Sequence, residues 1–137
     1  IIDWVLLLQP TDPLRESSDI ENVIKLALED DCDSIISIER VFAYHPALMK
    51  KIIKNRLFPF IIEEKEGTSR QKYDPPAYMR NGSIYITKRQ ILMKMNSIWG
   101  RNIKPMIMKE GGRISIDTLN DLKLAEILIE EKQIGKN

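Results

Sequence analysis

The sequence holds a single cysteine, Cys32, and a single histidine, His45. One cysteine excludes an intrachain disulfide framework, and the two residues together exclude a zinc site built from several thiolates or imidazoles. No apolar run approaches the ~18 residues that a membrane-spanning helix needs. Basic and acidic residues number 21 and 20, so the chain also lacks the basic excess that is typical of a general nucleic-acid coat.

The 137 residues are 43% hydrophobic and 30% charged, as is ordinary for one soluble globular domain. We therefore expect residues 1–137 to form a single domain. The chain begins with Ile1 rather than Met, and no basic region precedes its first apolar stretch. We expect the natural N-terminus to lie upstream and no signal peptide to be present here.

Charge is distributed unevenly along the chain. Ten bases stand against two acids between Arg70 and Arg113. A basic half of this kind predicts attraction of an anionic ligand. An unevenly charged, solvated surface explains the same pattern, and composition alone favours that explanation.

Strands and helices are expected to alternate. Trp4–Leu8 and Ser34–Ile38 are apolar or β-branched and predict strands. Apolar residues at helical spacing after the cap residues Ser17–Asp19 predict a helix. The last helix is predicted over Thr118–Lys132, with Thr118 as N-cap and Asp121 three residues on. The other expected elements are a short helix over 46–53, strands over 57–62, 82–87 and 104–109, a helix over 88–97 and a turn at Gly111-Gly112. This alternation indicates the α/β class with a largely parallel sheet.

Gln9 follows the first expected strand, and Pro10 and Pro13 stiffen the loop after it. In open α/β sheets the ligand crevice lies beyond the carboxyl ends of the strands. Gln9 is therefore placed to offer its side-chain amide to a ligand. A rigid strand-to-helix connection is the alternative explanation of these residues.

Arg70, Gln71, Asn81 and Tyr85 form a second group of candidates. A guanidinium binds a carboxylate or phosphate through two parallel hydrogen bonds, and the two amides suit hydroxyl or amide groups of a ligand. Structural alternatives exist for each residue. Asn81-Gly82 is a turn signal, and Tyr85 can be a core aromatic with its hydroxyl at the rim.

Asp117 stands just before the last helix. Mg²⁺ prefers one or two carboxylates together with phosphate and water, so a carboxylate here predicts a metal ligand. The alternative is helix-terminus electrostatics, because an acid at this place meets the positive end of the helix dipole. Gly111-Gly112 lacks the Lys-Ser/Thr of a phosphate-binding loop, and no serine or cysteine is spaced with His45 to form a nucleophilic triad.

Three blocks of sequence, taken together and in order, resemble the acylneuraminate cytidylyltransferases, also called CMP-sialic acid synthetases. The blocks are Leu8-Gln9-Pro10-Thr11-x-Pro13-Leu14-Arg15, then Arg70-Gln71 with Pro76-x-Tyr78-x-x-Asn81-Gly82-x-Ile84-Tyr85, and then Ile116-Asp117-Thr118-x-x-Asp121. Asp33-Ser34-Ile35-Ile36-Ser37 and His45-Pro46 fit the same pattern. The resemblance covers nearly the whole chain.

The resemblance implies a partial Rossmann-like three-layer α/β nucleotidyltransferase fold, of the nucleotide-diphospho-sugar transferase type, in a cytoplasmic homodimer. It implies that CMP passes from CTP to a nine-carbon acidic sugar with release of pyrophosphate, and that neither nucleic acid nor a membrane is a partner. By carry-over, the residues expected to bind the sugar are Gln9, Arg70, Gln71, Asn81 and Tyr85. Arg70 and Asp117 are the expected catalytic residues, and Asp117 is the expected ligand of Mg²⁺.

The chain departs from the family pattern at two places. The family's Gly-, Ser- and Lys-rich nucleotide loop and its Lys-Asn pair have no counterpart here, so we expect the C-terminal portion of a cytidylyltransferase domain, inactive by itself. The family's Asp-x-Asp before the last helix has Ser115 at its first position. Two alternatives follow: a non-catalytic sugar-binding or dimerising remnant of the same fold, and a cytidylyltransferase for 3-deoxy-octulosonate, pseudaminate or legionaminate.

Overall fold

A computed structural model of the protein describes residues 2–109 and 114–134. The chain divides into two compact units, and each is described by itself. The first unit comprises Ile1–Ile38 and Arg80–Asn137, and the second comprises Glu39–Met79. The turn predicted at Gly111-Gly112 lies outside the described residues. Within the described part, no helix has both the length and the apolar character needed to span a bilayer.

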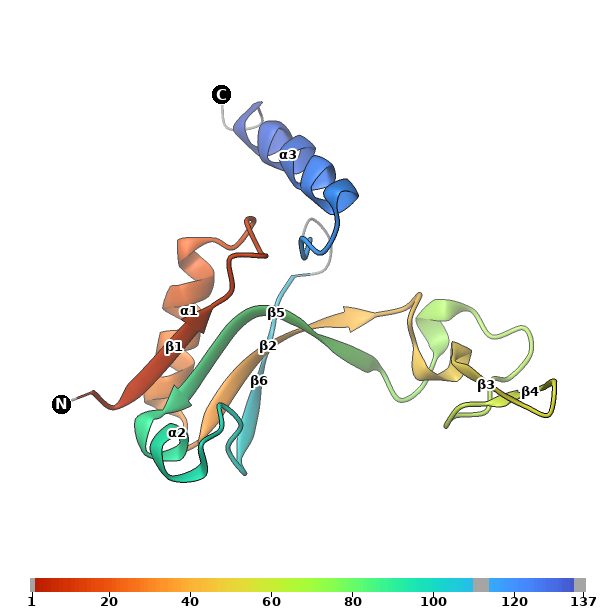
Figure 1. Ribbon diagram of the computed structural model, residues 1–137, viewed down its shortest axis with the longest axis horizontal. Helices are drawn as coiled ribbons and strands as arrows, with labels where there is room; N and C mark the ends of the chain where they lie inside the picture. Colours follow the sequence, from red (N-terminus) through yellow and green to blue (C-terminus); the bar gives the residue numbers. More distant parts are fainter. Residues whose placement is uncertain (1, 110–113, 135–137) are drawn as a thin grey trace. The chain divides into compact units, whose positions relative to one another are not determined.

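A four-stranded sheet in the order β1-β5-β2-β6 forms the centre of the first unit (Figure 1). Its strands are β1 (Trp4–Leu8), β2 (Ser34–Val41), β5 (Ala77–Lys88) and β6 (Ile103–Ile107). β2 pairs with β6 in parallel, whereas β1 and β5 pair antiparallel. The α/β class is confirmed, but the expectation of a largely parallel sheet is wrong because the sheet is mixed. Residue periodicity marks a segment as extended and carries no information on the direction of its neighbour.

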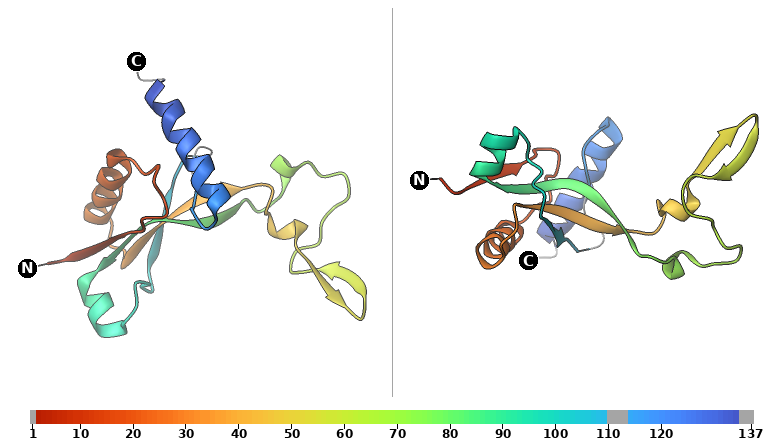
Figure 2. Two further views of the ribbon diagram at one scale, coloured as in Figure 1. Left: turned by 45° about the horizontal axis from the view of Figure 1, so that its top comes forward. Right: turned by 90° about the horizontal axis from the view of Figure 1, so that it is seen from below.

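Helix α1 (Ser17–Glu29) buries one face against this sheet. Val23 and Ala27 are 0% and 4% exposed, whereas Leu28 on the same helix is 74% exposed. The core cluster around α1 joins residues of three strands and the segments next to them: Cys32, Ile35, Ile84, Ile86, Met106 and Met108. Figure 2 shows α1 and the short helix α2 (Arg89–Met95) on opposite faces of the sheet.

Helix α3 (Leu119–Ile134) begins where the sequence predicts it. The Asp121 carboxylate accepts the Thr118 N–H at 2.7 Å, and the Asp121 N–H lies 3.3 Å from the Thr118 hydroxyl oxygen. This reciprocal pair is the capping box that the spacing predicts, and it fixes the helix start. Lys132 at the other end bonds Glu16 at 2.8 Å, which ties α3 to the start of α1.

The second unit contains the hairpin of β3 (Lys50–Ile53) and β4 (Arg56–Pro59). Its turn residues Lys54 and Asn55 both have positive φ, 47° and 59°, which is the conformation of a two-residue type I′ turn. The helix predicted over 46–53 is therefore wrong beyond one 3-10 turn at Pro46–Leu48. The adjacent β-branched residues at the end of β3 favour extended backbone, and pairing with β4 decides the outcome.

His45 organises the loop that precedes this hairpin. The side chain is 2% exposed and its ring stacks on that of Tyr73 at 4.9 Å. Nδ1 accepts the Ala47 N–H at 3.2 Å, and Nε2 lies 2.9 Å from the Pro75 carbonyl oxygen. Because Nδ1 accepts, the hydrogen of the neutral ring is on Nε2 and donates to Pro75. The Tyr73 hydroxyl in turn donates to Glu64 at 2.9 Å.

Candidate functional site

The side chain of Gln9, at the carboxyl end of β1, lies against Gly82 in β5. A Cβ built on Gly82 would lie 2.7 Å from Gln9 Oε1, closer than real Cβ contacts come. Gly82 also has a φ of +75°, a conformation that L-residues with side chains rarely adopt. The positive φ favours glycine here, and any larger residue would also have to displace the end of the Gln9 side chain.

The Arg15 guanidinium joins the ends of the two strands. Its Nη1 donates to the Gln9 carbonyl at 3.1 Å and to the Ser83 carbonyl at 2.8 Å. Both acceptors belong to backbone, so the guanidinium acts here as a structural clamp. It holds the strand end that carries Gln9 in register with the strand that carries Asn81 and Gly82.

Asn81 is held by polar contacts from β2 and from the end of β6. Its Oδ1 accepts the Ser37 hydroxyl at 2.6 Å and the Ser83 N–H at 3.2 Å. Its Nδ2 lies 3.2 Å from Met108 Sδ. These contacts place the predicted ligand-binding amides of Gln9 and Asn81 at the same end of the sheet, next to Gly82.

Tyr85 is 5% exposed and packs edge-on against Trp99, with ring centroids 6.4 Å apart. The Arg80 guanidinium lies 5.6 Å from the centre of the same Trp99 ring. These contacts agree with the core-aromatic explanation of Tyr85. Its role toward a sugar stays a prediction.

Arg70 and Gln71 belong to the second unit, on a 3-10 turn over Arg70–Lys72. Both side chains are exposed. In the part of the chain that the structure describes, neither is engaged by a hydrogen bond or an ion pair. They are therefore free to bind a ligand, and their roles stay predictions.

The segment before α3 reaches the loop that follows Gln9. The Ile116 N–H donates to the Thr11 carbonyl at 2.9 Å, so Asp117 lies beside the loop that is predicted to bind a ligand. The capping work at this helix is done by Asp121, whose pKa is lowered by hydrogen bonds from the Thr118 hydroxyl, the Thr118 N–H and the Asp117 N–H. The exposed Asp117 carboxylate itself takes no part in the cap. Among the described residues the cap bonds are thus made by Asp121, and the role of Asp117 stays a prediction.

No group of three or more metal-ligating side chains forms in the described ranges 2–109 and 114–134. Ser115 is exposed beside Asp117. One exposed carboxylate is a donor set that fits Mg²⁺ when phosphate oxygens and water supply the remaining ligands. It does not fit a metal held by protein alone.

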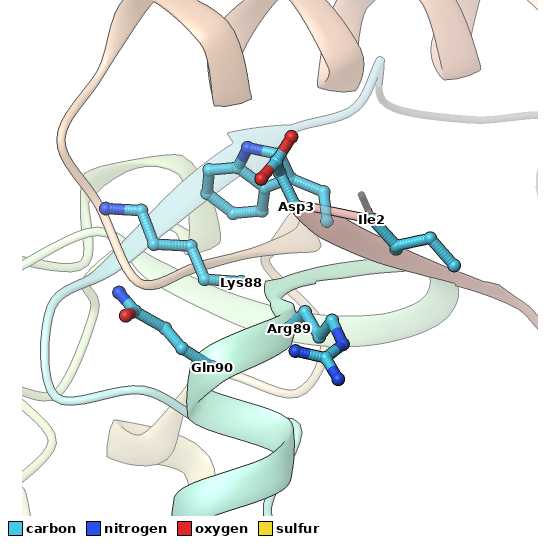
Figure 3. Close-up of a pocket in the computed structure, with 6 residues that line it drawn as sticks. Ile2, Asp3, Lys88, Arg89 and Gln90 are labelled. Carbon is cyan, nitrogen blue, oxygen red and sulfur yellow. The ribbon is translucent and has the colours of Figure 1, made fainter.

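A cavity of about 350 Å³ lies at the opposite end of β1 (Figure 3). It is lined by Ile2, Asp3, Trp4, Lys88, Arg89 and Gln90. Lys88 pairs with Asp31 at 2.8 Å, a hydrogen bond that raises the Lys88 pKa. None of the predicted site residues lines this cavity. It is therefore separate from the group formed at the other end of β1 by Gln9, Arg15, Ser37, Asn81 and Gly82, which we call the corner.

Comparison with known proteins gives the family. No family model matches the chain. "Post-translational flagellin modification protein B" of Campylobacter coli is 30% identical to it over 96% of this chain and 55% of that protein. A CMP-N,N'-diacetyllegionaminic acid synthase of Legionella pneumophila is 29% identical over 96% of this chain and 56% of its own. An N-acylneuraminate cytidylyltransferase of Streptococcus agalactiae is 26% identical over 85% of this chain and 28% of its own. The chain belongs to the acylneuraminate cytidylyltransferase family.

The resemblance that the sequence motifs indicate is thereby confirmed. The chain spans about half the length of the first two of these relatives, and it matches their C-terminal part. The side chains that build its corner include two that motif reasoning gave no role, Arg15 and Ser37. Both stood inside the quoted motifs, but their partners are backbone groups and a residue on another strand. Spacing within one stretch of sequence does not reveal such partners.

Proposed function

We propose that this chain is the C-terminal, sugar-binding portion of a cytidylyltransferase that transfers CMP from CTP to a nine-carbon acidic sugar. The observation that carries the proposal is the Ile116–Thr11 hydrogen bond, 2.9 Å long. It joins the stretch predicted to bind the metal to the loop predicted to bind the sugar, although the two are far apart in sequence. The names of relatives, which are CMP-N,N'-diacetyllegionaminic acid synthases and an N-acylneuraminate cytidylyltransferase, support the same reaction class.

In the proposed reaction a sugar hydroxyl attacks the α-phosphorus of CTP, and the bond to pyrophosphate breaks. The amides of Gln9 and Asn81 orient the sugar, and the Arg70 guanidinium binds its carboxylate through paired hydrogen bonds. Gln71 and Tyr85 are further candidate contacts. The chemistry that Mg²⁺ would supply, if bound with the nucleotide, is neutralisation of the charge that develops on the phosphate oxygens. Asp117 would hold the ion.

The proposed fold is the Rossmann-like three-layer α/β nucleotidyltransferase fold, in part. The mixed sheet with helices on both faces supports it. The main nucleotide-binding loop has no counterpart in these 137 residues, so in this proposal it belongs to further polypeptide. Because the reaction consumes CTP, we propose that it takes place in the cytoplasm.

We propose a homodimer as the assembled form. The β3–β4 hairpin leaves several large apolar side chains exposed, among them Ile52, Ile53, Leu57 and Phe58, which are 75%, 49%, 68% and 43% exposed. Ile52 pairs with Leu57 in the hairpin register, so these two exposed side chains lie on one face. Exposed apolar side chains that lie together mark interaction surfaces. A second copy of the chain is the proposed occupant.

Ser115 favours one alternative, a non-catalytic sugar-binding remnant. The family pattern has a carboxylate at this position, and a hydroxyl is a poorer Mg²⁺ ligand. Such a remnant would bind the acidic sugar and release no pyrophosphate. Measuring turnover distinguishes the cytidylyltransferase from the remnant, because only the enzyme releases pyrophosphate.

The test is a pyrophosphate-release assay on the full-length parent protein with CTP, Mg²⁺ and a panel of acidic sugars: neuraminate, legionaminate, pseudaminate and 3-deoxy-octulosonate. Turnover with at least one of these sugars supports the proposal. Absence of turnover from folded, Mg²⁺-replete protein excludes it, and sugar binding measured by calorimetry in the same sample then indicates the remnant.

Two substitutions locate the site within that assay. Arg70→Ala is expected to raise the sugar KM by roughly tenfold or more while the CTP KM is unchanged, because a charge-assisted pair is lost. Lys72→Ala, at an exposed cation of the same 3-10 turn, is the matched control and should change neither. Asp117→Asn should raise the Mg²⁺ concentration needed for half-maximal rate. If it mainly lowers thermal stability, the helix-terminus role is correct instead.

A further inference from the structure

The orientation of the Asn81 amide is set by two donors on one side. The Ser37 hydroxyl oxygen accepts the Ile84 N–H at 2.8 Å, so its own hydrogen is directed to Asn81 Oδ1 at 2.6 Å. The Ser83 N–H donates to the same Oδ1 at 3.2 Å. Rotating the amide by half a turn would point its NH₂ group at both donors and leave the Ser83 N–H unpaired.

The fixed orientation leaves the Nδ2 group facing the other way. One of its hydrogens is directed at Met108 Sδ, 3.2 Å away, which is a weak acceptor. The other amide hydrogen has no partner in the part of the chain that the structure describes. Asn81 is only partly buried, so an acceptor oxygen of a ligand can reach this hydrogen.

We propose that Ser37 is a positioning residue that fixes the Asn81 amide with its NH₂ group toward the sugar, which makes Asn81 a reader of an acceptor oxygen on the substrate. The inference rests on the proposed function, which it deepens. Ser37 is fully buried at 0% exposure, so it acts through Asn81 and does not touch the sugar. The substrate group that Asn81 reads is a carboxylate, carbonyl or hydroxyl oxygen and not an ammonium.

Ser83 provides a matched control in the neighbouring strand. It is also 0% exposed, and its hydroxyl oxygen has no hydrogen-bond partner among the described residues. Ser83→Ala and Ser37→Ala remove the same atom from equally buried positions. Only the second removes a hydrogen bond to Asn81, together with the bond that Ser37 Oγ accepts from the Ile84 N–H. The bond to Asn81 is therefore followed through the Asn81 amide signal and the sugar KM, and not through stability.

The experiment measures sugar KM, CTP KM and kcat of the full-length parent protein carrying Ser37→Ala, Ser37→Cys or Ser83→Ala. A nitrogen-15 spectrum of the Asn81 side-chain amide, assigned by its loss in Asn81→Leu, is recorded for each variant. Ser37→Cys preserves the packing and replaces a strong donor with a weak one, so it serves if Ser37→Ala does not fold.

Both Ser37 variants are expected to shift the Asn81 amide signal and to raise the sugar KM, by about tenfold for Ser37→Ala. CTP KM should be unchanged, and Ser83→Ala should leave all three quantities at the wild-type values. Unchanged sugar KM in the Ser37 variants overturns the proposal, as does an equal rise in Ser83→Ala. A wild-type protein that turns over no sugar refutes the proposed function separately. In that case the Asn81 amide signal alone tests the role of Ser37. A signal that does not shift in Ser37→Cys refutes the proposal that Ser37 positions Asn81.

Discussion

Replacing Gly82 with alanine tests the corner at its tightest point. The substitution places a methyl group 2.7 Å from Gln9 Oε1 on a residue whose φ is +75°. An L-residue in this backbone conformation costs ~1–2 kcal/mol, and the smaller entropy of the unfolded alanine chain returns ~0.4–1 kcal/mol. Moving the Gln9 side chain out of its rotamer adds about 0.5–1.5 kcal/mol. Gly82→Ala should therefore lower the free energy of unfolding by about 0.5–3 kcal/mol.

Gly67 separates the two contributions. Its φ is +77°, and nothing lies within 4 Å of a Cβ built there. Gly67→Ala should therefore show the backbone cost alone, smaller than that of Gly82→Ala by the contribution from Gln9.

The assay is urea denaturation followed by circular dichroism, on single variants and on the double variant Gln9→Ala/Gly82→Ala. Truncating Gln9 removes the obstructing amide, so the cost of Gly82→Ala should fall to that of Gly67→Ala, and the two substitutions should be non-additive. Equal costs of Gly82→Ala with and without the Gln9 side chain would refute the contact. The Asn81 orientation argued above would be unaffected by that result.

Two further predictions concern other parts of the chain. A hydrogen bond from the Asn102 N–H is the main cause that holds the pKa of Asp33 below its usual range. Asp33 therefore stabilises the fold fully above its unfolded pKa of about 4, and this contribution is lost as the pH falls through the lower folded pKa. Asp33→Asn should make the melting temperature depend less on pH in that acidic window, and an unchanged dependence contradicts the prediction. His45→Phe keeps a ring to stack on Tyr73 but leaves the Ala47 N–H and Pro75 carbonyl without their partner, so the free energy of unfolding should fall by ~1–3 kcal/mol. Thermal unfolding of this variant at wild-type temperature would show that the ring contributes only by stacking.

Local signals predicted the elements whose ends are set by neighbouring residues. Strand β1 matches the predicted Trp4–Leu8, and the start of α3 matches because Thr118 and Asp121 cap it through contacts three residues apart. The predicted helix over 46–53 fails for the opposite reason. Its second half pairs with β4, and no local pattern specifies that partner.

The candidate site shows the same difference between local and long-range contacts. Motif spacing singled out Gln9 and Asn81 separately, and the structure places both side chains beside Gly82. Their roles toward a sugar stay predictions. Motif spacing gave Ser37 no role, since the hydrogen bond to Asn81 joins residues on different strands. It also explained Asn81-Gly82 as a turn, whereas both residues lie within the 12-residue strand β5. The positive φ of Gly82 and the approach of the Gln9 side chain show why the second of them carries no side chain.

The contrast between the fixed corner and the 3-10 turn of the second unit has a consequence for engineering. Arg70 and Gln71 are exposed, with no hydrogen bond or ion pair to other described residues, so changing them costs folding little. Libraries randomised at these two positions should therefore retain soluble, folded members at high frequency. Randomising Ser37, Gly82 or Arg15 instead should eliminate most of the library before any activity is screened.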